Sequence, residues 1–381
     1  MRMNQDIFKL IHETPLIDHH CHFLINDASK NREMRLADVS TEADSSYPLL
    51  DTKERTAWWA FKSESKKFLK TDNIESLSTS QYVKFNHALF KNYNFKLLMI
   101  DTGFVPDDAI ESEEKTEELT GVTVKKIFRI ETCAEKCMLQ NENFFDWWEN
   151  LKQDIIHAKA SGFVGFKSIA AYRTGLCIKN PSVAEAESAF YNWKRSGVSR
   201  LTDAVLINFI LWNIASTIIE QNMPLQFHVG YGDADADLYK ANPLLMREFL
   251  RTWCYQGLSV VLLHCYPYHK EAGYLASVYP NVYFDTSLVN ALAPTSTKEV
   301  LNEALHLAPY SRYLFASDAS TYPEMYGVAA ATFESALASH LKGVDFVPYS
   351  QKEKWINEVC YLNSMNLYNL KKIGWEFRDG E

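Results

Sequence analysis

Short, almost uninterrupted apolar runs alternate along this chain with longer segments whose apolar residues recur at helical spacing. Continuous rather than alternating hydrophobicity is typical of strands that are buried on both faces of a parallel sheet. The clearest helical segments are residues 143–159, 199–221 and 244–255. The strand candidates are residues 15–20, 96–100, 124–130, 164–167, 224–228, 259–264, 282–285 and 313–317. This repeated order of strand and helix predicts an α/β fold, specifically a (β/α)8 TIM barrel.

The first and second strand candidates are separated by a long, charged interval. Residues 25–94 are too many for a single barrel loop. We therefore expect a helical insertion after the first strand. Loops that follow barrel strands lie on the catalytic face, so the insertion either roofs that face or packs at its periphery. Residues 322–381 are also expected to be helical, with 329–341 and 355–370 as amphipathic segments.

The chain has 381 residues and is 47% hydrophobic, which is enough for a large core. One barrel with an insertion accommodates this length, so we expect a single domain spanning residues 1–381. A net charge of −9 and the lack of a Lys- or Arg-rich block disfavour nucleic acid as a partner. The N-terminus does not resemble a signal peptide, and no apolar stretch approaches the ~20 residues of a membrane span. These features predict a cytoplasmic protein that binds no membrane.

Seven cysteines are scattered along the chain. Their odd number and the lack of a Cys-x-x-Cys pair favour reduced thiols, as in the cytosol. Cys133 and Cys137 are four residues apart and would share one face of a helix. No second pair of ligands lies near them in the sequence, so surface or half-buried thiols are favoured over a zinc site.

The first strand candidate leads into a His-x-His pair, His20 and His22. Side chains alternate along a strand, so both imidazoles and Asp18 should point to the same side. Two nitrogen ligands on one side suit zinc, and also iron, manganese or nickel. We expect Asp18 to support these ligands from behind. His19 and Cys21 should face the other side, toward the helices.

Later strand candidates also end in side chains of metal-binding type, namely Lys167, His228, His264 and Asp318. The C-terminal ends of parallel barrel strands meet at one face, where such side chains would converge. A single histidine there is more often a packed core residue, but two at successive strand ends favour ligation. Lys167 follows an apolar run, where an unpaired ammonium is costly. Three roles fit it: an ordinary lysine in a salt bridge, a lysine carboxylated by CO2 whose carbamate bridges two metals, or an ammonium group that binds an anionic substrate. Asp318 either caps the next helix or binds metal and accepts a proton.

The order His-x-His, Lys, His, His, Asp resembles that of the amidohydrolase superfamily of metal-dependent TIM-barrel hydrolases, and more closely its amidohydrolase-2 branch. The likeness spans nearly the whole chain and rests on residues 17–22, 166–176, 227–233, 264–267, 317–318 and 362–368. It implies that His20, His22 and Asp318 hold one divalent metal. His228 and His264 would hold a second, with Lys167 as a bridging carbamate. Zinc is the first expectation, and because many members of this branch carry a single metal and lack the lysine, the number of metals stays open.

The resemblance also implies a reaction. A metal-bound water becomes hydroxide and attacks an amide, lactone or related carbonyl, while Asp318 shuttles the proton to the leaving group. Tyr172 and Arg173 would stabilise the oxyanion or bind a substrate carboxylate, or else form a structural pair at the barrel mouth. Asp233 is a candidate pocket residue, although the acidic stretch 233–237 also suits a solvated loop. The expected partner is a small-molecule substrate, and a homo-oligomer is compatible with the resemblance.

Two other functions remain open from the sequence. A lyase such as a decarboxylase, or a sugar-acid isomerase such as uronate isomerase, would use a related His-x-His site with one metal and an unmodified Lys167. A noncatalytic binding module is the second alternative. The complete set of potential ligands disfavours it, because a metal-free module needs no convergent polar groups in its core. Specificity lies in loops, so the residues do not name the substrate.

Overall fold

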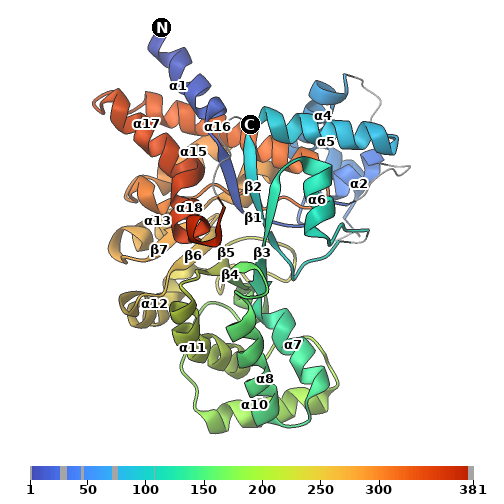
Figure 1. Ribbon diagram of the computed structural model, residues 1–381, viewed down its shortest axis with the longest axis vertical. Coiled ribbons are helices and arrows are strands. Elements are labelled where there is room, and N and C mark those ends of the chain that lie inside the picture. Colours follow the sequence, from blue (N-terminus) through green and yellow to red (C-terminus); the bar gives the residue numbers. More distant parts are fainter. Residues whose placement is uncertain (1, 26–31, 44–46, 71–75, 107, 376–381) are drawn as a thin grey trace.

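The computed structural model describes residues 2–25, 32–43, 47–70, 76–106 and 108–375 (Figure 1). Seven parallel strands form one curled sheet whose spatial order follows the chain. They are β1 (Leu16–Cys21), β2 (Phe95–Asp101), β3 (Thr123–Arg129), β4 (Phe163–Ser168), β5 (Leu225–Val229), β6 (Val260–His264) and β7 (Val282–Phe284). Each strand pairs in parallel with the next. The predicted α/β class is confirmed, and the sheet formed by the described residues has seven strands rather than eight.

The expected eighth strand is an irregular segment, which we name the closing segment (residues 313–318). The amide of Leu314 donates to the carbonyl of Phe284 on β7 at 3.0 Å, and the amide of His19 on β1 donates to the carbonyl of Phe315 at 3.3 Å. The segment therefore lies between the two edge strands. It forms too few ladder bonds to either edge to count as a strand, and it ends at Asp318, whose φ of 53° is left-handed.

Helices connect the strands, and most of the helical predictions are confirmed with shifted ends. Predicted segment 143–159 is α8 (Phe144–His157), whereas segment 244–255 divides into η1 (Pro243–Met246), α12 (Arg247–Trp253) and η2 (Cys254–Gln256). The remaining helices outside the insertion and the C-terminal region are α1 (Arg2–Glu13), α6 (Glu113–Thr120), α7 (Ile130–Gln140), α9 (Ala170–Arg173), α10 (Val183–Ser196), α13 (His269–Val278), α14 (Ser287–Leu292), α15 (Thr297–Ala304) and η3 (Tyr310–Arg312).

The helix predicted over residues 199–221 is α11 (Ala204–Gln221). It begins later than predicted because the side chain of Asp203 accepts bonds from the amides of Val205 and Leu206, the usual N-cap arrangement. By length and composition alone α11 is apolar enough to cross a membrane. The expectation that no apolar stretch approaches the length of a membrane span is therefore wrong for this helix. One side of it is buried among the core residues of this fold, and it contacts α8 and α10, as a core helix does.

In the described part of the interval between β1 and β2, where an insertion was expected, lie four helices: α2 (Arg32–Asp38), α3 (Leu49–Lys53), α4 (Thr56–Leu69) and α5 (Thr79–Asn92). Parts of the predicted interval, at residues 26–31, 44–46 and 71–75, fall outside the described residues. The guanidinium of Arg32 forms a fully buried ion pair with Glu324 at the start of α16 (Pro323–Lys342), and Ser65 donates to the same carboxylate. These contacts join the helices after β1 to the chain that follows Asp318.

The C-terminal region is mainly helical through residue 373 of the described chain and fills one end of the curled sheet. After α16 come α17 (Tyr349–Asn357), the π-helical turn η4 (Glu358–Leu362), α18 (Asn363–Leu367) and η5 (Leu370–Ile373). The expected helix over 355–370 is thus interrupted, and Asn363 at the break donates to the carbonyls of Tyr310 and Tyr313. Met365, Leu367 and Tyr368 pack with the apolar side chains inside the sheet. These side chains therefore shield the interior of the sheet from water at this end.

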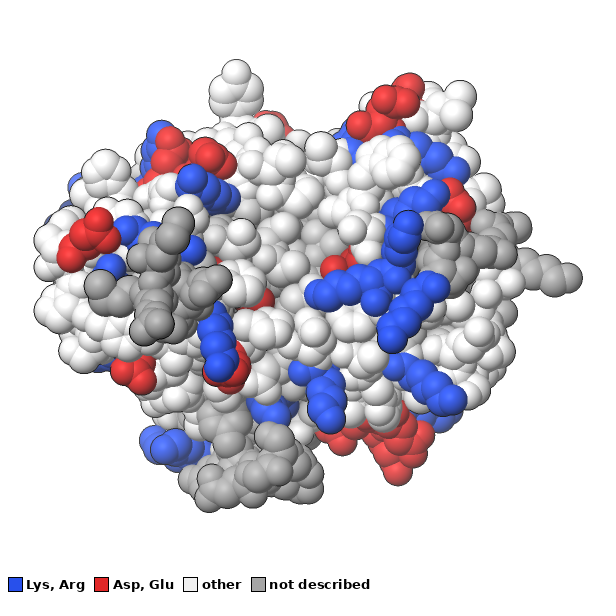
Figure 2. All heavy atoms as spheres, turned by 90° about the horizontal axis from the view of Figure 1, so that it is seen from above, with Lys and Arg blue, Asp and Glu red and all other residues white. Residues whose placement is uncertain are grey.

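Charged residues are dispersed over the face shown in Figure 2. Lys and Arg side chains form one closer group on the right of that view, and elsewhere they stand among acidic and uncharged residues. Among the described residues visible there, no continuous basic surface of the kind that tracks a nucleic-acid backbone is seen.

Candidate metal centre

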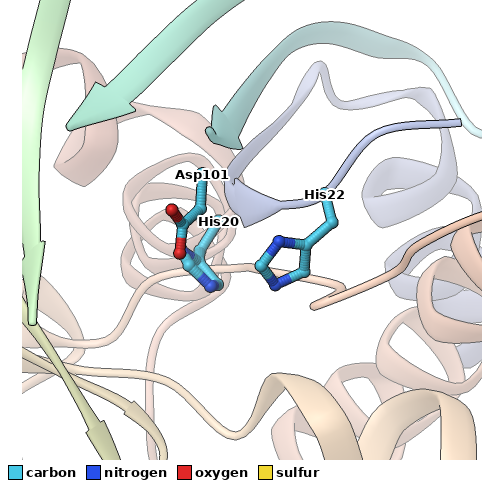
Figure 3. A group of neighbouring side chains, drawn as sticks. All are labelled: His20, His22 and Asp101. Carbon is cyan, nitrogen blue, oxygen red and sulfur yellow. The ribbon is translucent and has the colours of Figure 1, made fainter. Parts of the chain in front are cut away.

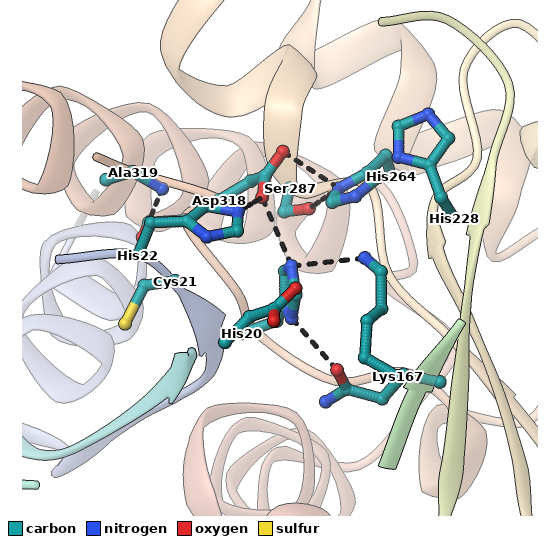
Figure 4. Close-up of polar contacts among 12 residues, drawn as sticks. His20, Cys21, His22, Lys167, His228, His264, Ser287, Asp318 and Ala319 are labelled. Carbon is teal, nitrogen blue, oxygen red and sulfur yellow. Dashed lines mark hydrogen bonds and ion pairs between the residues drawn. The ribbon is translucent and has the colours of Figure 1, made fainter. Parts of the chain in front are cut away.

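Three histidines converge on the carboxylate of Asp318 (Figure 4). The Nε2 atoms of His20 and His22 lie 3.3 and 3.2 Å from Asp318 Oδ1. The Nδ1 atom of His264 lies 3.2 Å from Asp318 Oδ2. His20 and His22 stand at the end of β1, His264 ends β6, and Asp318 belongs to the closing segment. Residues separated by up to some three hundred positions therefore meet in one cluster, as the sequence predicts for strand ends of a curled parallel sheet.

Two members of this cluster have left-handed backbone conformations. The φ angle is 68° at His264 and 53° at Asp318, although neither residue is glycine. Such conformations cost free energy and persist where the surrounding structure over-determines them, often at functional sites. At both positions the chain turns sharply as the strand or closing segment ends, and the turn directs the side chain into the cluster.

Asp18 supports the cluster through the closing segment. Its carboxyl group accepts hydrogen bonds from the Ser317 amide at 3.0 Å and the His20 amide at 3.3 Å, and the Ser317 hydroxyl also bonds to it. Burial raises the pKa of Asp18 to about 8 despite these bonds. Asp18 thus holds Ser317 next to Asp318, in line with the supporting role expected for it.

His19 does not face the outer helices as expected. Its Nε2 lies 3.0 Å from Asp285 and its Nδ1 lies 3.1 Å from the Tyr368 hydroxyl, which belongs to the packing inside the sheet. The register of β1 against β2 shifts between Asp18 and Cys21. An irregularity of this kind breaks the alternation of side chains, so His19 and His20 both turn inward. Cys21 joins the outer core cluster, as expected.

Gln226 on β5 determines which nitrogen of His20 faces Asp318. The Gln226 Oε1 atom lies 2.9 Å from His20 Nδ1. The amide nitrogen of Gln226 donates to the His19 carbonyl at 3.0 Å and to the Tyr368 hydroxyl at 2.7 Å. With both donors engaged, the amide oxygen must accept from a protonated His20 Nδ1. The lone pair of His20 is then on Nε2, directed at Asp318. Sequence reasoning missed Gln226, although an amide within a buried apolar strand is a usable signal.

The donor atoms fit a divalent cation. Asp318 Oδ1 is buried and has no hydrogen-bond partner, although two imidazole nitrogens point at it. Burial lowers the pKa of His20 and His264 well below the usual range, with Lys167 and His228 adding to the effect respectively. Both rings are therefore neutral near neutral pH, which is the form that ligates metal. Three imidazole nitrogens and a carboxylate form a donor set that suits zinc.

Asp101 is a further member that sequence reasoning missed (Figure 3). It ends β2, and one of its oxygens lies within 4.8 Å of ligand atoms of His20 and His22. Arg129, at the end of β3, binds the Asp101 carboxylate through Nε at 3.1 Å and through Nη2. Burial alone would raise the pKa of Asp101, but Arg129 outweighs it and lowers the pKa to about 2. The signal was available, because Asp101 follows an apolar run as the other site residues do.

Lys167 and His228 lie beside the histidine cluster. Lys167 Nζ is 3.3 Å from His20 Nε2, and burial lowers its pKa to about 8 although Asp101 and Asp318 oppose the shift. The ring centroid of His228 lies 4.6 Å from that of His264 and 4.2 Å from that of Tyr172. His228 Nε2 is directed at the Tyr231 carbonyl, 3.1 Å away. In Figure 4 the Lys167 side chain rises between His20 and His228.

A cavity of about 400 Å³ opens above this cluster. Its walls include Asp38, Val39, Thr41, Glu42 and Ala43 from the end of α2 and the chain after it, so part of the expected insertion lines the cavity. The remaining lining residues are His22, Phe104, Arg129, Lys167, Ile169, Tyr172, Arg173, Arg200, His228, Asp233, His264, Asp318, Ser320, Thr321 and Met325. All three residues expected to contact substrate, Tyr172, Arg173 and Asp233, are among them.

The cavity wall carries both cationic and acidic groups. Arg173 Nη2 lies 3.3 Å from Glu135, while its Nε and Nη1 are buried and have no hydrogen-bond partner. Glu42 was not singled out from the sequence. Burial, with Asp318 and Asp233 adding to it, raises the pKa of Glu42 to about 8. The cavity therefore offers guanidinium donors to an anion and, at neutral pH, a protonated carboxyl group.

Comparison with known proteins places this geometry in a family context. The sequence profile of the family described as Amidohydrolase matches residues 151–370. A crystal structure from Lactobacillus casei, of a chain provisionally assigned as a metal-dependent hydrolase, is 52% identical, covers 97% of this chain and 99% of its own, and has a TM-score of 0.95. Uronate isomerase from Thermotoga maritima is 15% identical over 96% of this chain and 97% of its own, with a TM-score of 0.69, a likeness of fold alone.

A curated protein also matches. Protein fluG of Emericella nidulans is 28% identical over 312 residues, which is 73% of this chain and 36% of that protein. The chain thus spans about a third of the length of this relative.

Proposed function

Because this chain belongs to the amidohydrolase family, we propose that it is a metal-dependent hydrolase that cleaves an amide, lactone or related bond in a small anionic molecule. The observation that carries the proposal is the convergence of three imidazoles on the Asp318 carboxylate at 3.2 to 3.3 Å. Histidines gathered around one carboxylate suit a cation, whereas a packed apolar core does not require them.

His20, His22, His264 and Asp318 would hold the cation, with Asp101 close enough to His20 and His22 to join or support them. A divalent cation at this point would polarise a substrate carbonyl and lower the pKa of a bound water. Gln226 keeps the His20 lone pair on Nε2. Asp318, which lines the cavity, would accept the proton from the attacking water on its carboxylate and return it to the leaving amine or alcohol.

Lys167 decides between one and two cations in this proposal. Its lowered pKa of about 8 leaves a substantial neutral fraction of the amine near neutral pH, and only the neutral amine reacts with CO2. We propose that Lys167 is carboxylated; in this two-cation form His20, His22 and Asp318 would hold the first cation, and the carbamate, His228 and His264 would hold the second. A lysine that stays an ammonium would instead pair with the substrate anion.

Recognition of an anion rests on Arg173 and its neighbours. Two donor atoms of Arg173 are buried at the cavity without partners, and a guanidinium in that position can bind a carboxylate. The Tyr172 ring packs on His228, and its hydroxyl lies against Gly232. Asp233 shares the wall and would accept from substrate hydroxyl or amine groups.

An isomerase or decarboxylase is the second candidate function. The fold likeness to uronate isomerases supports it, together with an arginine-lined cavity that suits a sugar acid. This candidate requires one cation and an unmodified Lys167. We also propose a (β/α)8 barrel in which the closing segment replaces the eighth strand, and a cytoplasmic location, which the seven free cysteines support.

Metal analysis and a substrate panel test the proposal together. We expect the cluster around Asp318 to hold about two equivalents of divalent metal, so the Lys167→Ala variant should contain one equivalent less than the wild-type protein. An equal metal content in the two proteins would overturn the two-metal form and favour the isomerase or decarboxylase. The panel should include N-acyl amino acids, lactones with a carboxylate and uronates. Asp318→Asn serves as the inactive control, and absence of metal from the wild-type protein would refute an enzyme of this type.

A further inference from the structure

Three potential metal ligands lie outside the cavity, on the antiparallel pair of helices α7 and α8 (Figure 1). Cys133 and Cys137 stand on one face of α7, and Asp154 stands on the facing side of α8. The Sγ atoms of Cys133 and Cys137 lie 3.3 and 3.5 Å from the same oxygen, Asp154 Oδ2. All three ligand atoms lie within 4.8 Å of one another. The spacing of the two cysteines in the sequence did not reveal that Asp154 lies beside them.

The distances match those of a tetrahedral zinc site. Zinc binds thiolate sulfur at about 2.3 Å and carboxylate oxygen at about 2.0–2.2 Å. At a tetrahedral angle these bond lengths separate sulfur from oxygen by roughly 3.5 Å. The observed separations of 3.3 and 3.5 Å are close to this value, and the two Sγ atoms lie within 4.8 Å of each other.

Access and charge also suit a cation. Cys137 is buried, Cys133 is half-buried and Asp154 is exposed, so a cation would approach from the side of Asp154. Water would supply the fourth ligand. Two thiolates and a carboxylate favour a soft or borderline ion over magnesium or calcium, which prefer oxygen ligands.

We propose that Cys133, Cys137 and Asp154 bind a thiophilic divalent cation such as Zn²⁺ or Cd²⁺ at a site separate from the cluster around Asp318. The cation would cross-link α7 to α8 near the open end of the helical pair, opposite the short connection at residues 141–143. The inference does not depend on the proposed hydrolase activity, because none of the three residues lines the cavity.

The position of α7 gives this site a route to the cavity. Glu135, on the same helix, binds Arg173 at 3.3 Å and accepts from the Leu201 amide at 2.7 Å. Glu131 accepts from the Ser168 hydroxyl at 2.6 Å and from the Ile169 amide at 3.0 Å. An ion that fixes α7 against α8 therefore also steadies the helix that holds Arg173 and the end of β4.

Cobalt(II) distinguishes this site from the histidine cluster. We would incubate the reduced protein with excess Co²⁺ long enough to exchange with any ion already at this site, and record the near-ultraviolet thiolate-to-cobalt charge-transfer band. Ligands from the Asp318 cluster are imidazoles and carboxylates, which produce no such band. We expect the band in the wild-type protein and in Cys177→Ser, which alters an exposed cysteine elsewhere. Cys133→Ser should abolish it, and Asp154→Asn should weaken Co²⁺ binding more than tenfold.

A second measurement guards against misfolded variants. Cys133 is half-buried, so Cys133→Ser should unfold at nearly the same temperature as the wild-type protein when no ion is added. Cd²⁺ should then raise the unfolding temperature of the wild-type protein and not that of the variant, because an ion that binds only the folded state stabilises it. No charge-transfer band in the wild-type protein, or an undiminished band in Cys133→Ser, would overturn the proposal. Either result leaves the assignment of the Asp318 cluster untouched.

Discussion

Gln226 accepts a hydrogen bond from His20 Nδ1 at 2.9 Å, and this contact orients the ring so that Nε2 faces Asp318. The Gln226 amide cannot rotate to offer its nitrogen instead, because that nitrogen already donates to the His19 carbonyl and the Tyr368 hydroxyl. A residue with no contact to the cavity thus selects the ligating nitrogen of a candidate ligand.

Replacing Gln226 with leucine should weaken metal binding. The variant removes the acceptor for His20 Nδ1, so the ring can adopt the other tautomer, and partners of this kind typically contribute 10- to 100-fold in metal affinity. Competition with a chromophoric chelator measures the change. Tyr368→Phe is the comparison variant: it keeps the bond from Gln226 to His20 and removes one of two acceptors of the Gln226 amide nitrogen, together with a contact to His19, so it should weaken binding less. Equal affinities of Gln226→Leu and wild type would contradict this role.

Removal of the metal should destabilise the folded protein. A ligand that binds only the folded state stabilises it by about 2.7 kcal/mol when its free concentration is 100 times its Kd. Chelation should therefore lower the free energy of unfolding by an amount of this order, and added Zn²⁺ should restore it. Urea unfolding with and without chelator makes the measurement. Asp318→Asn should respond far less to chelator, and an equal response in that variant would place the stabilising metal elsewhere.

Glu42 should make the stability of the metal-free protein depend on pH. Its pKa is raised from 4.5 to about 8 by burial and by Asp318 and Asp233. Between these values the folded protein holds a proton that the unfolded chain has released, so stability falls as pH rises through this window. Glu42→Gln lacks this loss. We expect it to match the wild-type protein at about pH 5 and to exceed it by on the order of 1–2 kcal/mol at about pH 9.

The control for Glu42 is the exposed carboxylate Glu111, whose replacement by glutamine should leave the pH dependence unchanged. Urea unfolding at both pH values, on chelated protein, supplies the data. If Glu42→Gln and wild type differ by the same amount at both pH values, the carboxyl group does not titrate between them and its place at the cavity wall has no electrostatic consequence.

The buried ion pair of Arg32 and Glu324 should be important for stability. Both side chains are fully buried, and the guanidinium also lies over the rings of Phe85 and Tyr322. Arg32→Met would leave Glu324 as an uncompensated buried charge, which typically costs 3–5 kcal/mol. Because Glu324 follows the closing segment closely, we also expect weaker metal binding in this variant.

Unfolding in urea gives the cost, and two further variants interpret it. Arg32→Lys keeps the charge but loses the planar donors, so its loss should be smaller. The double variant Arg32→Met, Glu324→Gln removes both charges and should recover part of the stability. A double variant no more stable than Arg32→Met would show that packing rather than charge dominates at this position.

Several site residues could be placed from the sequence because their environment is local in the chain. His20, His264 and Asp318 each follow an apolar run, and the ends of parallel strands meet at one face. Asp101 obeyed the same rule and was missed only because the strand was ended one residue early. His19 was placed on the wrong side, because a register irregularity in β1 interrupts the alternation on which the prediction relied.

The sequence by itself determined the α/β class, the approximate strand positions and the order of the potential ligands, because burial on both faces imposes continuous apolar runs and the chain order of parallel strands sets the order of their ends. Only the tertiary structure decided that Gln226 orients His20, that Glu42 and Arg173 share a cavity wall, and that Asp154 faces two cysteines on another helix. These relationships join residues far apart in the chain, and their distances follow from how helices and loops pack, which no local pattern encodes.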